Sequence, residues 1–142
     1  MIKIIWVDDD INRSGLRSEK DELRERGCEI IAVQGTDSFL EMLRDPQGNF
    51  DCDCIILDLS MPVGSEFSLK DAEYGSRTGI LLMKRIRDSF LFSKVKIIIY
   101  SIVDNDDVFN ECKNAGALYL KKANLLYYEF ADEVMRFVKS KQ

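Results

Sequence analysis

Cys54-Ile55-Ile56-Leu57-Asp58-Leu59-Ser60-Met61-Pro62 is the stretch that decides the fold of this chain. Its apolar run is short and bounded by turn-forming residues, which is typical of a buried strand. The run ends at Asp58, and a charged group there is costly unless it faces solvent, a cation or a ligand. In open parallel sheets, ligands bind at the carboxyl edge of the strands. Asp58 is therefore either an acidic strand terminator or the centre of a site, and the other strand ends distinguish the two.

Composition limits the class of protein. The chain has 142 residues, of which 46% are hydrophobic and 32% charged, as in one ordinary soluble globular domain. The formal net charge of -5 argues against non-specific binding to nucleic acid or an anionic membrane. The chain has no His, which excludes His-based catalysis and His-ligated metal sites. Only Cys52 and Cys54 are close in sequence, so we expect reduced thiols in a cytoplasmic protein rather than a zinc site.

Strand and helix patterns alternate along the whole chain. The expected strands cover residues 2–7, 29–33, 54–57, 95–100 and 117–120. The expected helices begin at a cap on Asn12 or Ser14, at Ser38, at Gly79, at a cap on Asp104 or Asn105, and at a cap on Asn124. This alternation predicts a doubly wound α/β fold, in which a five-stranded parallel sheet carries helices on both faces.

Polar side chains follow the expected strands at one edge of the sheet. They are Asp8, Asp9 and Asp10 after the first strand, Asp58 after the third, Ser101 after the fourth and Lys122 after the fifth. Carboxylates brought together repel one another, and a divalent cation offsets that repulsion. Magnesium suits such an all-oxygen site. A cation, an ammonium and a hydroxyl around one Asp are what an aspartyl nucleophile needs to accept a phosphoryl group.

These residues carry a resemblance to a known family. The matching pieces are Val7-Asp8-Asp9-Asp10, Leu57-Asp58-Leu59-Ser60-Met61-Pro62, Ile99-Tyr100-Ser101, Ala115-Gly116-Ala117 and Tyr119-Leu120-Lys121-Lys122. In their order and spacing, the chain resembles a response-regulator receiver domain over essentially its whole length. The resemblance implies a flavodoxin-like sheet with strand order 2-1-3-4-5. It also implies a single receiver domain over residues 1–142 with no output domain, which catalyses only its own phosphorylation and dephosphorylation.

The resemblance assigns the acceptor and a metal site. By position, Asp58 is the phosphoacceptor of a two-component phosphorelay, and Asp8 and Asp9 are the acidic pair. Mg2+ is then held by Asp8, Asp9, Asp58 and the backbone carbonyl of Ser60. The donor is a phosphohistidine of a sensor histidine kinase or of a histidine phosphotransfer protein, and a downstream protein effector reads the result.

The resemblance also assigns the phosphoryl-binding and switch residues. Ser101 hydrogen-bonds the bound phosphoryl group and Lys122 pairs with it, with Lys121 as the alternative lysine. Ser101 and Tyr119 form the switch, in which the position of the aromatic ring reports the phosphorylation state.

Three departures from the receiver pattern bear on function. Ile102 stands where a small residue usually leaves room for the phosphoryl group, and Ala123 replaces a Pro that often follows a cis peptide bond. Residues 63–78 form a long polar loop in place of a much shorter connection, beside Asp58. These departures leave open a second function, that of an interaction-only module that has lost phosphotransfer.

A hydrolase is the third reading. Asp8 and Asp10 form a D-x-D pair, as in haloacid-dehalogenase-like phosphatases, with Asp8 as nucleophile and Asp10 as acid and base. However, Asn12 stands where that family has Thr or Val, and no cap domain is evident.

The sequence leaves the role of two helix surfaces undecided. A basic stripe follows the first helix, and it is either a solvated face or a docking surface for an acidic partner; its residues are Arg13, Arg17, Lys20 and Arg24. The last helix, which ends at about Lys139, carries more apolar residues than one face can bury. Its excess is either extra core packing or a surface for a homodimer or a partner.

Overall fold

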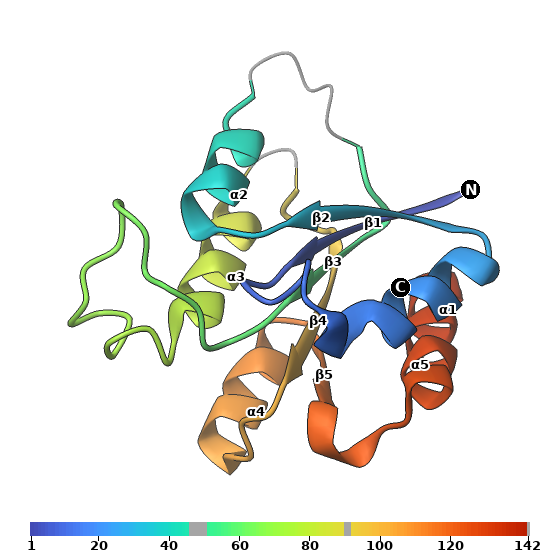
Figure 1. Ribbon diagram of the computed structural model, residues 1–142. Helices are drawn as coiled ribbons and strands as arrows, with labels where there is room; N and C mark the ends of the chain where they lie inside the picture. The colour runs from blue at the N-terminus through green and yellow to red at the C-terminus, as the bar shows by residue number, and fades with distance from the viewer. Residues whose placement is uncertain (46–50, 90–91, 142) are drawn as a thin grey trace.

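A computed structural model describes residues 1–45, 51–89 and 92–141 of the chain. It contains one sheet of five parallel strands in the order β2-β1-β3-β4-β5 (Figure 1). The strands are β1 (Ile2–Val7), β2 (Cys28–Val33), β3 (Cys54–Leu57), β4 (Lys96–Ser101) and β5 (Leu118–Lys121). The predicted doubly wound α/β fold and its strand order are confirmed.

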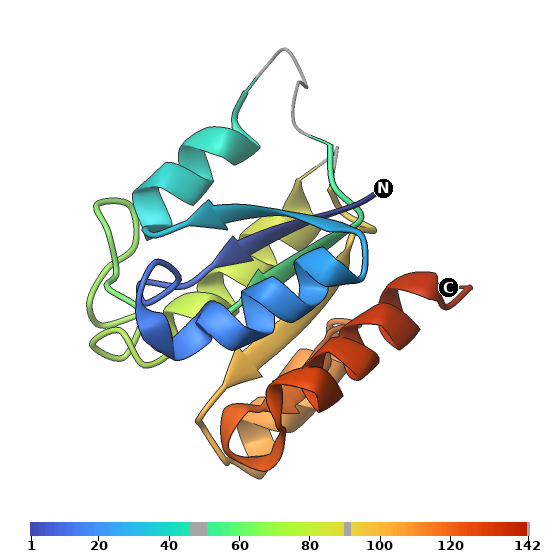
Figure 2. The same cartoon turned by 45° about the vertical axis from the view of Figure 1, so that its right-hand side comes forward.

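Helices cover both faces of the sheet (Figures 1 and 2). One face carries α1 (Arg17–Glu25) and α5 (Tyr127–Lys139), and the other carries α2 (Thr36–Leu43), α3 (Thr78–Asp88) and α4 (Asp106–Asn114). Alternate strand residues point to opposite faces. Ile5 and Val7 therefore pack under α2 and α3, while Ile4 and Trp6 pack with α1 and α5. None of the helices in the described residues is long and apolar enough to cross a membrane.

Two of the predicted helix starts are wrong and one is confirmed. The segment before α1 forms turns and a short 3-10 helix at Ser14–Leu16, because Ile11 and Leu16 are buried and draw it onto the core. The last helix begins at Tyr127 rather than after a cap on Asn124, which lies in a second 3-10 helix, Lys122–Asn124. There the Glu129 carboxylate accepts the backbone N–H of Leu126 at 2.9 Å.

The cap on α4 is the one that the sequence identified. The Asn105 side chain accepts a hydrogen bond from the backbone N–H of Val108 at 3.1 Å. This bond satisfies one of the N–H groups that a helix start leaves without an intrahelical partner.

The predicted loop after β3 is present. Between Leu57 and Thr78 the chain contains neither strand nor helix, and all of these residues are described. One helical turn occurs inside it, where the N–H of Ala72 donates to the carbonyl of Ser68 at 3.1 Å. Figure 1 shows the loop projecting on the side of the molecule opposite α5.

Candidate functional site

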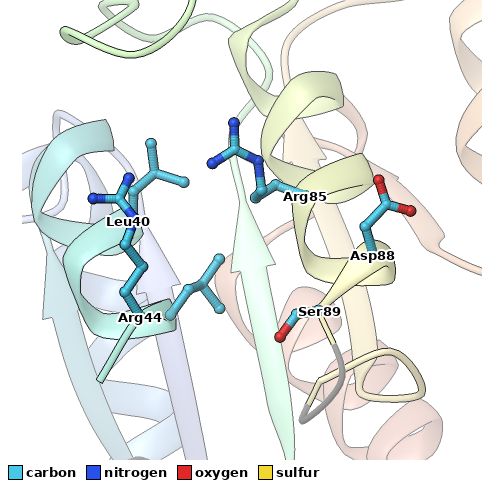
Figure 3. A pocket seen from close by; sticks show the side chains of 6 residues that line it. Leu40, Arg44, Arg85, Asp88 and Ser89 are labelled. Carbon is cyan, nitrogen blue, oxygen red and sulfur yellow. The ribbon is translucent and has the colours of Figure 1, made fainter. Parts of the chain in front are cut away.

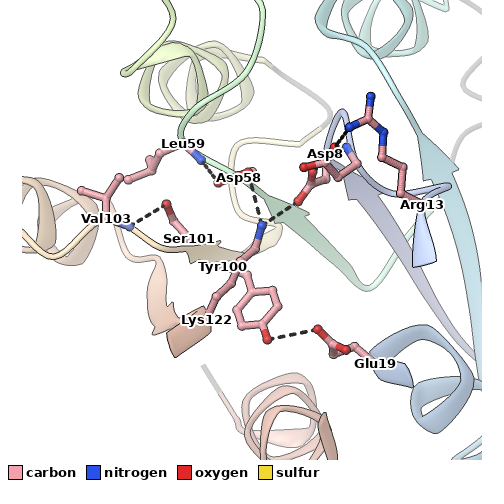
Figure 4. A network of polar contacts seen from close by, with 10 residues as sticks. Asp8, Arg13, Glu19, Asp58, Leu59, Tyr100, Ser101, Val103 and Lys122 are labelled. Carbon is pink, nitrogen blue, oxygen red and sulfur yellow. Dashed lines mark hydrogen bonds and ion pairs between the residues drawn. The ribbon is translucent and has the colours of Figure 1, made fainter. Parts of the chain in front are cut away.

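The carboxyl edge of the sheet brings two aspartates and one lysine together. Lys122 Nζ donates to Asp8 Oδ2 at 3.0 Å and to Asp58 Oδ2 at 3.3 Å (Figure 4). Asp8 is fully buried and Asp58 is 8% exposed. A single ammonium group therefore bridges two buried carboxylates that come from different strands.

Strand register produces this meeting point. Val7 on β1 is paired with Leu57 on β3, so both strands end at the same level and the next residue on each is an aspartate. The Asp58 N–H donates to the Val7 carbonyl at 3.2 Å, which extends the pairing by one residue. Asp58 Oδ1 in turn accepts the backbone N–H of Leu59 at 2.7 Å, which orients the carboxylate.

Gly79 lets the start of α3 approach this turn. A Cβ atom at this position would lie 2.1 Å from the Asp58 carbonyl oxygen and 2.8 Å from the Leu59 Cα. Both neighbours are backbone atoms, so no side chain larger than hydrogen fits without a shift of the chain. The backbone around Asp58 is therefore supported by direct contact with α3.

The choice between the two lysines depends on how β5 ends. Lys121 is the last residue of the strand, and its Nζ pairs with the exposed Asp104 at 2.7 Å. Lys122 opens the following 3-10 helix and reaches the two buried carboxylates. The structure thus places Lys122, and not Lys121, beside Asp58.

Negative charge is in excess at this site. Burial raises the pKa of the Asp58 carboxyl, and the charge of Asp8 adds to this, although Lys122 acts in the opposite direction. Burial also raises the pKa of Asp9, helped by the charges of Asp10 and Asp8. For Lys122, burial alone would lower the pKa, but the charges of Asp58 and Asp8 raise it, so the ammonium stays protonated. A second positive charge would relieve the crowding.

The first-strand aspartates form a set of oxygen donors. Each of Asp8, Asp9 and Asp10 offers a carboxylate oxygen, and the three oxygens lie within 4.8 Å of one another. Carboxylate oxygens suit a hard divalent cation such as Mg2+ or Mn2+, so these residues fit the expected metal. Asp58 is outside this set of three and is joined to it through the Lys122 bridge to Asp8.

Asp10 joins Asp8 and Asp9 in the acidic cluster, as expected from its place after the first strand, although the resemblance assigned only Asp8 and Asp9 to the metal. Asp10 donates its backbone N–H to Asp8 Oδ1 at 2.8 Å, and its carboxylate pairs with Arg13 at 3.1 Å. Its position directly after the first strand, within Val7-Asp8-Asp9-Asp10, was the signal in the sequence, and the same residue forms the D-x-D pair of the hydrolase alternative. Ser60, the fourth expected metal-site residue, is exposed and lines a pocket together with Asp9.

Ser101 and Tyr119 both hydrogen-bond the backbone of Val103. The buried Ser101 hydroxyl oxygen accepts the N–H of Val103 at 3.2 Å, and the Tyr119 hydroxyl donates to the carbonyl of Val103 at 2.6 Å. Burial raises the pKa of Tyr119 to about 12. The ring of Phe109 on α4 packs edge-on against Tyr119 at 5.8 Å between centroids. Movement of the Val103 backbone would therefore change the hydrogen bonds of both hydroxyl groups.

Many solved structures with a similar fold are response regulators. Response regulator DrrB from Thermotoga maritima has 21% identity and a TM-score of 0.68, and the alignment covers 98% of this chain and 53% of that one. A receiver protein from Burkholderia phymatum has 26% identity and a TM-score of 0.70, with 99% and 98% covered. The Mn2+-bound form of response regulator Rcp1 has 14% identity and a TM-score of 0.75, with 100% and 98% covered.

The chain has the receiver fold. It spans about half the length of DrrB. No protein-family model matches the sequence, and no curated protein matches it significantly. The resemblance inferred from the strand-end residues is thus confirmed at the level of the fold.

The receiver site contains an aromatic support that the sequence did not reveal. The Tyr100 ring lies under Lys122, with Nζ 5.6 Å from the ring centroid (Figure 4). The same ring stacks on Phe130, with 4.1 Å between the centroids. The Tyr100 hydroxyl pairs with Glu19 of α1 at 3.3 Å. An aromatic residue inside an apolar strand is usually a core residue, so its place beside Lys122 is a product of the fold.

The departures from the receiver pattern have visible consequences. Ile102 is 73% exposed, so its side chain does not fill the space between Asp58 and Ser101. No cis peptide occurs among residues 1–45, 51–89 and 92–141, which include the Lys122–Ala123 bond. The 3-10 helix Lys122–Asn124 contains Ala123 at the position where the family often has Pro.

Proposed function

We propose that this chain is the phosphoacceptor switch of a two-component phosphorelay, with Asp58 as the acceptor. The observation that carries the proposal is the bridge from Lys122 to both Asp8 and Asp58 at the carboxyl edge of a receiver fold. A cation paired with an oriented carboxylate provides a nucleophile and a partner for the incoming negative charge.

Phosphoryl transfer replaces a P–N bond by a P–O bond. An oxygen of Asp58 attacks the phosphorus of the partner's phosphohistidine, and the P–N bond breaks. The electron pair leaves on the imidazole nitrogen, which takes a proton from solvent. Lys122 then shifts from the carboxylate to the phosphoryl oxygens. Mg2+ held by Asp8, Asp9, Asp58 and the Ser60 carbonyl would neutralise charge on the transferring group.

The proposed switch uses the backbone between β4 and α4. Ser101 now accepts the Val103 N–H, but a phosphoryl group on Asp58 offers the Ser101 hydroxyl a strong acceptor. The segment that Ser101 holds would then move, and with it the carbonyl that binds the Tyr119 hydroxyl. Such a two-state element changes the affinity of an effector when the phosphoryl group favours one state.

We place the kinase or phosphotransfer partner on α1. A groove there is lined by Arg17, Lys20 and Arg24 of α1 and by Arg13, which precedes the helix and pairs with Asp10 at the acceptor edge. Asp21 pairs loosely with Arg17 and Arg24, at 3.7 Å each, and exposed pairs of this kind contribute little. An acidic partner surface would replace them. A homodimer through the exposed Tyr127 and its neighbours on α5 stays a prediction, as do a cytoplasmic location and the absence of direct nucleic-acid or membrane binding.

Intact mass tests the proposal. The protein is incubated with acetyl phosphate and Mg2+, and its mass is compared with that of Asp58→Asn. One phosphoryl group is expected on the wild-type protein and none on the variant. Asp104→Asn, which removes an exposed carboxylate paired with Lys121, is the matched control and should gain the group normally. No gain on the wild-type protein, or an equal gain on Asp58→Asn, sinks the proposal.

A further inference from the structure

The long connection after β3 forms one wall of a pocket next to the acceptor. Tyr74, Gly75 and Ser76 line a cavity of about 360 Å³, whose other walls are Asp9 and the segment Ser60 to Pro62. It is a shallow depression of the surface that is open to solvent. Asp9 and Ser60 belong to the proposed metal corner, and Ser60 follows Asp58 by two residues, so the cavity adjoins the turn that carries the acceptor.

Hydrogen bonds hold the inner end of the wall in place. The N–H of Met61 donates to the Gly75 carbonyl at 3.2 Å, and the Thr78 hydroxyl donates to the Met61 carbonyl at 2.7 Å. The N–H of Arg77 donates to the carbonyl of the buried Ala72 at 2.9 Å. These bonds fix the Tyr74–Ser76 segment relative to the turn that follows Asp58.

Charged side chains hold the outer part of the loop. Glu66 pairs with Arg44 at the end of α2 and with Arg85 of α3, the latter at 3.5 Å. The Arg85 guanidinium also lies over the Phe67 ring, 5.2 Å from its centroid. Figure 3 shows the two arginines reaching from their separate helices on either side of the pocket between α2 and α3. The loop is thus anchored at both ends and forms a fixed wall.

The backbone at Tyr74 is strained. Its φ is 59° and that of Glu73 is 48°, in the left-handed region that non-glycine residues rarely adopt. Such strain persists only where the surroundings impose it, and it concentrates at functional positions. The Tyr74 side chain is nevertheless 85% exposed. A strained backbone therefore presents an aromatic ring to solvent beside Asp9 and the turn that follows Asp58.

We infer that Tyr74 recognises the imidazole ring of the partner's phosphohistidine by ring stacking as the phosphoryl group is delivered to Asp58. This inference rests on the proposed function. Aromatic rings attract one another in offset or edge-on arrangements. When the P–N bond has broken, the leaving nitrogen takes one proton from solvent, and the resulting neutral imidazole would lie against the Tyr74 ring.

Two small donors separate ring recognition from phosphotransfer. Phosphoimidazole carries the imidazole ring and phosphoramidate does not. Phosphorylation rates are measured with each donor in Mg2+ for wild type, Tyr74→Phe and Tyr74→Ala. For Tyr74→Ala we expect a loss of about 3- to 10-fold with phosphoimidazole and no loss with phosphoramidate. Tyr74→Phe should behave as wild type with both donors. Equal effects of Tyr74→Ala on the two donors overturn the inference.

Both variants should fold like the wild-type protein. Phe and Ala tolerate the positive φ at position 74 about as well as Tyr does, and the replaced side chain is exposed. Leu69→Ala removes an exposed apolar side chain from the same loop that does not line the cavity, and it is the matched control. It should leave both rates unchanged. A loss with phosphoimidazole in Leu69→Ala equal to that in Tyr74→Ala would count against the inference.

A binding measurement keeps this inference separate from the proposed function. Absence of phosphoryl gain with every donor means that the proposed function fails. Binding of unreacted phosphoimidazole to Asp58→Asn in Mg2+, followed by nuclear magnetic resonance, is then the readout. Adding Tyr74→Ala to Asp58→Asn should raise the Kd for phosphoimidazole about 3- to 10-fold and leave that for phosphoramidate unchanged. Equal Kd values for phosphoimidazole in the two proteins overturn the inference.

Discussion

Replacing Asp58 by Asn should stabilise the protein when divalent cations are absent. Asp8 and Asp58 are both buried, and Lys122 is the ammonium group that bridges them. Asn keeps the shape and the hydrogen bond that the side chain accepts from Leu59, but it removes one buried charge. Lys122 is then left in a one-to-one pair with Asp8 at 3.0 Å, so no charge is orphaned.

The magnitude follows from these distances. Lys122 Nζ is 3.3 Å from Asp58 Oδ2, and at an effective dielectric constant of about 20 the attraction is about 5 kcal/mol. Because Lys122 Nζ is 3.0 Å from Asp8 Oδ2 and 3.3 Å from Asp58 Oδ2, the two carboxylate oxygens are at most about 6.3 Å apart, and their repulsion opposes the attraction by about 3 kcal/mol. Taking the carboxylate out of water costs several kcal/mol more. The balance disfavours the ionised Asp58 by about 1–2 kcal/mol, in agreement with the direction in which burial shifts its pKa.

Thermal unfolding followed by circular dichroism measures this difference. In the presence of a chelator, Asp58→Asn should melt about 3–6 °C above the wild-type protein. At Mg2+ concentrations about 100-fold above Kd, the wild-type protein should gain about 2.7 kcal/mol and the variant less, so the difference shrinks or reverses. Asp104→Asn, at an exposed position, should change the free energy of unfolding by no more than about 0.5 kcal/mol in chelator or in Mg2+.

Either of two outcomes refutes the reasoning. A variant that melts below the wild-type protein in chelator contradicts charge crowding at the acceptor. A Tm of the wild-type protein that does not change with Mg2+ contradicts the proposal of a cation site at the acidic cluster.

Two further predictions concern the support of the site and of the loop. Gly79→Ala should cost about 3 kcal/mol in urea unfolding and slow phosphorylation, because its Cβ would lie 2.1 Å from a backbone oxygen of the acceptor; Gly15→Ala, with open space around its Cβ, should cost less than about 0.5 kcal/mol, and equal costs would contradict the steric argument. Glu111 pairs with Arg77 at the end of the loop, and the hydrogen bond from Arg77 lowers the pKa of Glu111 below its usual 4.5. A lowered carboxyl pKa adds stability that is fully present above pH 4.5 and is lost as pH falls through the folded-state pKa. Glu111→Gln should therefore cost up to about 1 kcal/mol at pH 7 and almost nothing once wild-type Glu111 is protonated, and a cost that does not change with pH would show that the ion pair is not its origin.

Local sequence determined the strands and the character of their ends. Runs such as Ile55 to Leu57 are apolar throughout because a parallel sheet is covered on both faces, and this pattern is visible without any structure. Because parallel strands share one carboxyl edge, the order of Asp8, Asp58 and Ser101 along the chain already predicted a polar site there. Hence the fold class, the strand order implied by the resemblance and the residues of the edge were accessible from the sequence.

Only the tertiary structure decided which groups at that edge touch. Lys121 and Lys122 are adjacent and chemically identical, and the turn after β5 directs only the second to Asp58. The Lys122–Asp8 contact joins residues 114 positions apart, and such contacts depend on packing and register, which local periodicity does not encode. The same holds for Tyr74, whose segment has no regular period and whose place beside Asp9 comes from long-range hydrogen bonds to the turn after β3.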